Sequence, residues 1–284
     1  MPVMGKRKKG SRFDRIVLWG IVVSVVAIAL LLWGPFQKMR KAPERKPPVA
    51  GKKLDREGRE HVITAVIAVV IDDLGQDLKP AQEVLGMPDR ITLAVMPRLP
   101  QSKKIAELAR QGSREVLVHI PMEAKVRAEK RDAPGTLRLD MTPMEFIAAV
   151  NEDLDSVPGA AGINNHEGSA LTENKQAMTF LMSELKARNL FFLDSLTNAK
   201  STAFSVAKEF GLRAAKRDVF LDNESDRPSK IRKQFDELTR VAKQNGRAIG
   251  IGHPHPATIA ELRKWLAKID DEGIEIVPVS ALVK

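Results

Sequence analysis

Residues 62–71 read VITAVIAVVI, an unbroken apolar run rich in β-branched side chains, and Asp72 and Asp73 follow at once. Such a run is typical of a strand that is buried on both faces, as strands are in parallel sheets. Residues 77–86 then show the spacing of an amphipathic helix. The stretch therefore predicts a first strand–helix unit of an α/β fold, with two carboxylates at the carboxyl end of the strand.

Short apolar runs and amphipathic stretches alternate in the same way to the end of the chain. Further strands are predicted at 91–96, 116–119, 161–164, 190–193, 212–215, 219–221, 248–251 and 274–279. Most are separated by predicted helices, including one over 172–188 with Thr172 as its cap, whereas residues 124–140 are predicted to form a long loop. Seven or eight such units in about 220 residues predict a distorted (β/α)7–8 barrel, with an open doubly wound sheet as the alternative. No glycine-rich phosphate loop follows Ile71, which argues against nucleotide binding.

The net charge of +10 lies in the first part of the chain. Residues 1–61 hold 15 Lys and Arg against 5 Asp and Glu, which leaves 31 of each kind in residues 62–284. The domain is neutral and the chain as a whole has only 5% aromatic residues, so nucleic-acid binding is not expected. Because the chain has no cysteine, a disulfide scaffold, a thiolate zinc site and a cysteine nucleophile are excluded.

An uncharged run, IVLWGIVVSVVAIALLLW over residues 16–33, indicates a membrane segment. Its length suits a hydrocarbon core of about 30 Å, and Trp19 and Trp33 lie near its ends, where indoles favour the interface. We predict a basic cytoplasmic tail over 1–15, a transmembrane signal anchor over 16–36, a basic proline-containing linker over 37–61 and a domain over 62–284. The positive-inside rule then predicts a single-pass protein of a bacterial-type inner membrane with a periplasmic domain; a cleaved signal peptide is the alternative.

Polar side chains gather where the predicted strands end. They are Asp72, Asp73, His119, Glu123, Asn164, Asn165, His166, Glu167, Asp194, Arg217, Asp218, Asp222, His253 and His255. Individually they could serve as helix caps, turn residues or ion pairs. Because the carboxyl ends of parallel strands share one face, we instead expect one composite site.

Carboxylates and imidazoles without thiolates suit a hydrated divalent ion, with zinc as the first candidate. Such an ion lowers the pKa of water, while a carboxylate can act as general base and a histidine as general acid. From residue types alone, Asp72, Asp73, His119, His166, His253 and His255 could fill these roles in more than one way.

Six motifs occur in order: IDDLG (71–75), HIPME (119–123), NNHEGS (164–169), FFLDS (191–195), RDVFLD (217–222) and GHPHP (252–256). Together they resemble the divergent polysaccharide deacetylases, over about residues 65–282. That family is similar to the NodB-like carbohydrate esterases, whose fold is a distorted (β/α) barrel. Those enzymes remove N- or O-acetyl groups from chitin-like or peptidoglycan sugars.

The resemblance also implies roles for individual residues. Asp72 would be the base, Asp73, His119 and His166 the metal ligands, and His253 or His255 the acid. Glu123 stands where the NodB pattern has a second histidine ligand, and Arg217 with Asp218 would replace an absent Arg-Pro-Pro-Tyr-Gly motif. Asn164, Asn165, Glu167, Asp194 and Asp222 would support the site.

The resemblance thus predicts a membrane-anchored, metal-dependent deacetylase of acetylated glycan or a peptidoglycan-like polymer. The alternative is a non-catalytic envelope protein that uses the same barrel to bind glycan or a protein partner.

Overall fold

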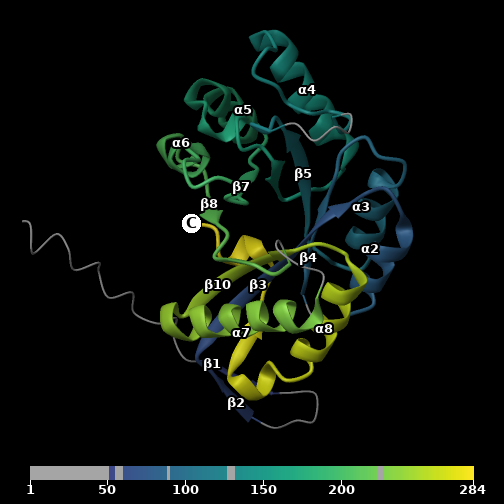
Figure 1. Ribbon diagram of the computed structural model, residues 1–284, viewed down its shortest axis with the longest axis vertical. Coiled ribbons are helices and arrows are strands. Elements are labelled where there is room, and N and C mark those ends of the chain that lie inside the picture. Colours follow the sequence, from purple (N-terminus) through teal and green to yellow (C-terminus); the bar gives the residue numbers. More distant parts are fainter. Residues whose placement is uncertain (1–50, 55–59, 88–89, 127–131, 223–226) are drawn as a thin grey trace, which may run out of the picture. The chain divides into compact units, whose positions relative to one another are not determined.

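The strand predicted first in the chain, β3 (Ala65–Leu74), is an interior strand of a parallel sheet in the computed structural model, with a neighbour on each side (Figure 1). The structure describes residues 51–54, 60–87, 90–126, 132–222 and 227–284, all within one compact unit, residues 47–284. In β3 Ala65 and the apolar residues 67–71 are fully buried and Val66 is half-buried, which agrees with the apolar run.

All neighbours in this sheet are parallel, in the order β8-β7-β6-β5-β4-β3-β10-β9, and β11 pairs with the start of β3. The other strands are β4 (Thr92–Val95), β5 (Val116–Met122), β6 (Gly162–Glu167), β7 (Phe191–Asp194), β8 (Ala214–Lys216), β9 (Val219–Phe220), β10 (Arg247–Gly252) and β11 (Ile274–Ile276). The end strands β8 and β9 are joined in the chain by Arg217 and Asp218, yet no pairing between them is found in the described residues. The predicted barrel is therefore an open, curled half-barrel, whose end strands β8 and β9 have only three and two residues.

Helices follow most of these strands. They are α2 (Leu78–Leu85), α3 (Ser102–Gln111), α4 (Pro143–Ser156), α5 (Lys175–Ala187), α6 (Ala203–Glu209), α7 (Pro228–Asn245) and α8 (Pro256–Leu266), with single 3-10 turns η1 (Leu171–Glu173), η2 (Asp270–Glu272) and η3 (Val279–Ala281). The start of α4 shows why local sequence suffices for many of them. Thr142 and Glu145 form a capping box and Pro143 occupies the first turn.

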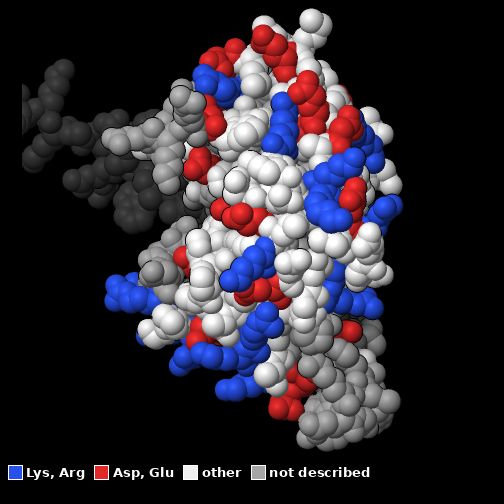
Figure 2. Space-filling view, turned by 90° about the vertical axis from the view of Figure 1, so that its right-hand side faces the viewer, with Lys and Arg blue, Asp and Glu red and all other residues white. Residues whose placement is uncertain are grey.

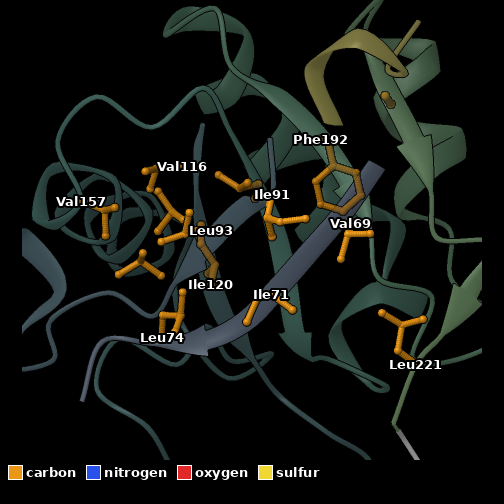
Figure 3. Close-up of a cluster of buried hydrophobic side chains, with 14 of the residues drawn as sticks. Val69, Ile71, Leu74, Ile91, Leu93, Val116, Ile120, Val157, Phe192 and Leu221 are labelled. Carbon is orange, nitrogen blue, oxygen red and sulfur yellow. The ribbon is translucent and has the colours of Figure 1, made fainter. Parts of the chain in front are cut away.

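The two faces of the sheet contribute to two separate hydrophobic clusters. Alternate β3 residues Ile67, Val69 and Ile71 belong to the larger cluster, which also contains the buried helix residues; Figure 3 shows Val69 and Ile71 among Leu93, Ile120 and Phe192. The intervening Ala68 and Val70 belong to a smaller cluster inside the curl. Each face of the strand thus has its own apolar environment.

The end of the chain covers the inner face of the curled sheet. Val279, Leu282 and Val283 are buried in the smaller cluster. The backbone of Lys284 exchanges two hydrogen bonds with Ala214 of β8, at 3.0 and 3.3 Å, and the Val279 N–H donates to Thr92 Oγ1 at 3.1 Å. The interior is therefore filled by the C-terminal segment as well as by strand side chains.

Local structure departs from the sequence prediction at three places. The run predicted as one strand breaks at Thr64, since β2 (Glu60–Ile63) pairs antiparallel with β1 (Gly51–Leu54), so the last part of the predicted linker has regular structure. Strand β3 continues through the two aspartates to Leu74, with an irregular register between Ile71 and Leu74. The predicted helix 172–188 is split into η1 and α5, because Asn174 rather than Thr172 accepts the capping hydrogen bond, from the Ala177 N–H.

The predicted tail and membrane anchor, residues 1–36, lie outside the described residues. Among the residues that the structure describes, no helix is long and apolar enough to cross a membrane. Figure 2 shows basic and acidic side chains interspersed over one face of the molecule.

A glycine in β6 provides a test of how tightly neighbouring strands pack. A Cβ on Gly162 would lie 2.6 Å from both the backbone oxygen and the ring Cδ2 of Phe191. We expect Gly162→Ala to lower the free energy of unfolding by about 1–3 kcal/mol, as overpacking does. Gly112→Ala is the matched control, because its nearest atoms would be 3.6 Å away. Urea unfolding of both variants measures the difference, and equal midpoints would contradict this account of the packing.

Candidate metal and catalytic site

The carboxyl ends of the strands surround a cavity of about 350 Å³. Of the residues singled out in the sequence, those that line it are Asp72, His119, Asn165, His166, Glu167, Arg217 and His253. They come from β3, β5, β6, the segment between β8 and β9, and the residue after β10. The sheet therefore brings together side chains that are far apart in the chain.

Three ligand-type atoms converge at one side of this cavity. Asp73 Oδ1 lies 3.1 Å from His119 Nε2 and 2.8 Å from His166 Nδ1, and the two ring nitrogens are 3.2 Å apart. Asp73 has a left-handed backbone (φ 56°) within the irregular part of β3, so its side chain turns toward the histidines instead of following the strand alternation. A triangle of this size fits a shared divalent ion with bonds of about 2.0–2.2 Å.

Hydrogen bonding identifies which nitrogen of His119 is free. Asn164 Nδ2 donates to Asp72 Oδ1 at 2.8 Å and to Ser195 Oγ at 3.2 Å, so Asn164 Oδ1 is the acceptor for His119 Nδ1–H at 2.9 Å. His119 Nε2 then presents a lone pair to the triangle when the ring is neutral. Asp73 Oδ1 is a buried atom that makes no hydrogen bond. Lone pairs that face one another in this way suit a cation, and Asn164 supplies the outer hydrogen bond that orients a ligand histidine.

The pKa shifts of Asp73 and His119 also favour a bound cation at the triangle. Burial opposes ionisation of Asp73, yet the neighbouring imidazoles of His119 and His166 hold its pKa far below the usual range. Burial disfavours the charged form of His119, but Asp72 and Asp73 outweigh it and raise the pKa of the imidazole. These shifts indicate a strongly negative potential that favours a positive charge at this point.

Asp72 lies beside the triangle and is almost fully buried. Its Oδ2 is 3.6 Å from His119 Nε2. Burial raises the pKa of Asp72, while His119 and the hydrogen bond from Asn164 oppose that rise. Asp72 is thus a carboxylate whose proton affinity is increased, next to a set of metal-ligand atoms, which suits a general base.

A histidine–aspartate pair faces the triangle across the cavity. His253 Nδ1 donates to Asp222 Oδ1 at 2.8 Å, and His253 Nε2 lies 3.8 Å from Asp73 Oδ2. Burial favours the neutral ring, but the hydrogen bond and charge of Asp222, together with Asp73 and Asp72, raise the pKa of His253 to about 9. The Phe220 ring stacks on the imidazole with centroids 5.5 Å apart. A histidine held protonated and oriented at neutral pH can act as a general acid.

Asp222, His253 and His255 also lie close enough together to resemble a second ligand group. Asp222 Oδ2 already accepts from the His253 N–H at 2.8 Å and from Thr258 Oγ1 at 2.6 Å. These hydrogen bonds use the carboxylate to hold the segment between β10 and α8 in place. His255 is exposed at the start of α8 and does not line the cavity. The geometry therefore distinguishes the two candidates for the acid in favour of His253.

Other residues singled out in the sequence support the backbone around the cavity. Glu123 is outside the triangle, and its Oε2 accepts from the Leu139 N–H at 2.8 Å. Asp194 Oδ1 accepts from the Leu196 N–H at 2.9 Å, Asp218 Oδ2 from the Ile249 N–H at 2.8 Å, and Asn165 Nδ2 donates to the Glu167 oxygen at 2.9 Å.

Arg217 joins two parts of the cavity wall. Its Nε and Nη2 donate to the carbonyl oxygens of Ser195 and Leu196, at 2.7 and 3.0 Å, and its guanidinium lies 4.4 Å from the centre of the Phe220 ring. Phe220, Leu196 and Thr258 were not predicted as site residues. Phe220 lies in the RDVFLD motif and Leu196 directly follows the FFLDS motif, whereas nothing in the sequence around Thr258 indicates its bond to Asp222.

Comparison with known proteins identifies the family of this chain. The family model described as divergent polysaccharide deacetylase matches residues 69–283. An uncharacterized protein of Haemophilus influenzae is 38% identical over 216 residues, 76% of each chain, and the uncharacterized protein YibQ of Escherichia coli K12 is 38% identical over 224 residues, 78% of this chain and 68% of that one.

Among solved structures, an uncharacterized protein of Agrobacterium tumefaciens C58 is similar with a TM-score of 0.74 and 26% identity, over 84% of this chain and 99% of that one. The resemblance drawn from the six motifs is confirmed: the chain belongs to the divergent polysaccharide deacetylase family.

Proposed function

We propose that this protein is a metal-dependent hydrolase that removes acetyl groups from an envelope glycan. The observation that carries the proposal is the triangle of Asp73 Oδ1, His119 Nε2 and His166 Nδ1, which lies between a buried carboxylate, Asp72, and a protonated histidine, His253. Membership of a deacetylase family supports an acetylated sugar as substrate.

Each side chain has a role that follows from its surroundings. Asp73, His119 and His166 would hold the ion, for which zinc is our first candidate because the donors are two imidazoles and one carboxylate. A divalent ion in such a site supplies Lewis acidity and lowers the pKa of a water molecule. Asp72 would take a proton from the attacking water, and His253 would give a proton to the departing amine or alcohol.

Asn164 would link the general base to one of the metal ligands. Its amide nitrogen donates to Asp72 and its oxygen accepts from His119, so one buried side chain orients both the base and a ligand. Asp222 would in turn keep His253 protonated and fix the direction of its ring.

We further propose that residues 16–36 anchor the protein in a bacterial-type inner membrane and that the domain faces the periplasm. The uncharged run and its basic N-terminal flank support this orientation. Digestion of the domain by protease added to spheroplasts is the expected result, and protection of the domain would contradict the orientation.

The purified full-length chain, loaded with zinc, is expected to release acetate from N-acetylglucosamine oligomers or from peptidoglycan. Asp72→Asn should remove this release, since the amide cannot accept the proton, and should leave the metal content unchanged. Acetate is measured by an enzyme-coupled assay, with and without a chelator. Retention of glycan in a pulldown by wild-type protein that releases no acetate would favour the binding-only function instead.

A further inference from the structure

Leu196 has a backbone conformation that its side chain disfavours. It lies two residues after the end of β7 and has φ 48°, in the left-handed region where residues other than Gly, Asn and Asp are uncommon. Asp73 and Glu167, two of the five other non-glycine residues with positive φ among the described residues, also belong to the ends of strands around the cavity. A disfavoured conformation that is kept at a site of this kind suggests a function for the residue that adopts it.

Hydrogen bonds on both sides hold Leu196 in this conformation. Its N–H donates to the buried carboxylate of Asp194 at 2.9 Å, and its carbonyl oxygen accepts from Arg217 Nη2 at 3.0 Å. The preceding residue, Ser195, is held in the same way by Asn165 Oδ1 and Arg217 Nε. The surrounding polar side chains thus determine the direction of the Leu196 side chain.

The Leu196 side chain is apolar but is not part of the hydrophobic core. Among the described residues, Leu196 is in neither hydrophobic cluster and is not one of the side chains packed against them. It is half-buried and lines the 350 Å³ cavity, where most other lining residues are polar. Phe220, another apolar lining residue, already contacts Arg217 and His253 with its ring.

We propose that Leu196 determines the size of the acyl group that the site accepts, by closing the cavity against groups larger than acetyl. This inference rests on the proposed deacetylase function, because it assigns the acyl part of that substrate to the Leu196 side of the cavity. The left-handed backbone is what places a branched apolar side chain there.

The test uses carboxylate binding, which does not require turnover. Full-length, zinc-loaded wild-type protein is expected to bind acetate more tightly than propionate, measured by calorimetric titration. In Leu196→Gly the ratio of acetate to propionate affinity should fall at least about tenfold, which is the discrimination one methylene group provides in an apolar pocket. Leu196→Met, which substitutes an unbranched apolar side chain of similar volume, should keep most of the ratio.

Ser113→Gly is the matched control, because Ser113 has φ 54° and lies between α3 and β5, outside this cavity. Glycine favours the left-handed region, so both glycine variants should unfold at the same or higher urea concentration than wild type. Only Leu196→Gly should change the affinity ratio.

An unchanged ratio in Leu196→Gly, or wild-type protein that binds neither carboxylate, would overturn the proposal. If wild type prefers acetate but releases none from glycan, the deacetylase function fails while the size-selecting role of Leu196 stands.

Discussion

Asp73→Asn is expected to abolish stoichiometric metal binding and, with it, acetate release. The substitution keeps the size of the side chain but removes the charge from the oxygen that lies 2.8 and 3.1 Å from the two imidazole nitrogens. Wild-type protein should hold about one divalent ion per chain. Because loss of an outer hydrogen-bond partner alone costs about 10- to 100-fold in affinity or activity, loss of a ligand should cost more than about 100-fold.

Two further variants grade this effect. Asn164→Ala removes the hydrogen bond to His119 Nδ1 and should weaken metal binding by about 10- to 100-fold without abolishing it. His255→Ala should leave the metal content unchanged, because His255 lies outside the triangle. Metal analysis after dialysis against a weak chelator gives the stoichiometry. Absence of a bound ion in wild type, or equal retention in Asp73→Asn, would contradict the metal site.

Asp222→Asn is expected to move the alkaline limb of the pH profile of kcat/KM to lower pH. The active form of an acid is protonated, and Asp222 contributes to raising the pKa of His253 to about 9. When that charge is removed, the pKa falls and the proton is lost at lower pH, so activity declines earlier as pH rises. His253→Ala removes the acid itself and should lower kcat by roughly 100- to 10,000-fold.

Asp218→Asn is the comparison variant for this shift. Asp218 stands four residues before Asp222 in the same motif, but its carboxylate accepts from the Ile249 N–H and it is not among the groups that raise the pKa of His253. Its alkaline limb should therefore stay in place. A limb that moves equally in both variants, or in neither, would show that Asp222 does not control the protonation of His253.

The general position of the site follows from sequence because it depends on a rule of topology. Asp72, His119, His166 and His253 each lie in or directly after a strand, and parallel strands must bring their carboxyl ends to one side. The same rule requires no knowledge of individual contacts. It therefore predicted the convergence of these side chains while leaving their pairings open.

The pairings themselves depend on backbone details that periodicity does not reveal. The irregular register of β3 and the left-handed φ of Asp73 turn that carboxylate toward His119, where regular strand alternation alone would not place it. Periodicity also does not show that the sheet stays open at its ends. The end strand β9 has two residues, which pair with Gly250 and Ile251 of β10. For this reason the sequence predicted a distorted barrel, whereas the sheet is an open half-barrel.

The place of β3 in the sheet has a consequence for how the protein is made. β3 is the first strand of the large sheet in the chain, and one of its neighbours is β10, whose Arg247 pairs with Val66, near the opposite end of the sequence. Proteins dominated by such distant pairings fold slowly, because chain entropy must be lost before the contacts form. During synthesis, which begins at the N-terminus, the edge of β3 that pairs with β10 would stay unpaired until almost the whole chain had been synthesised. We infer that this chain requires shielding of that edge during synthesis.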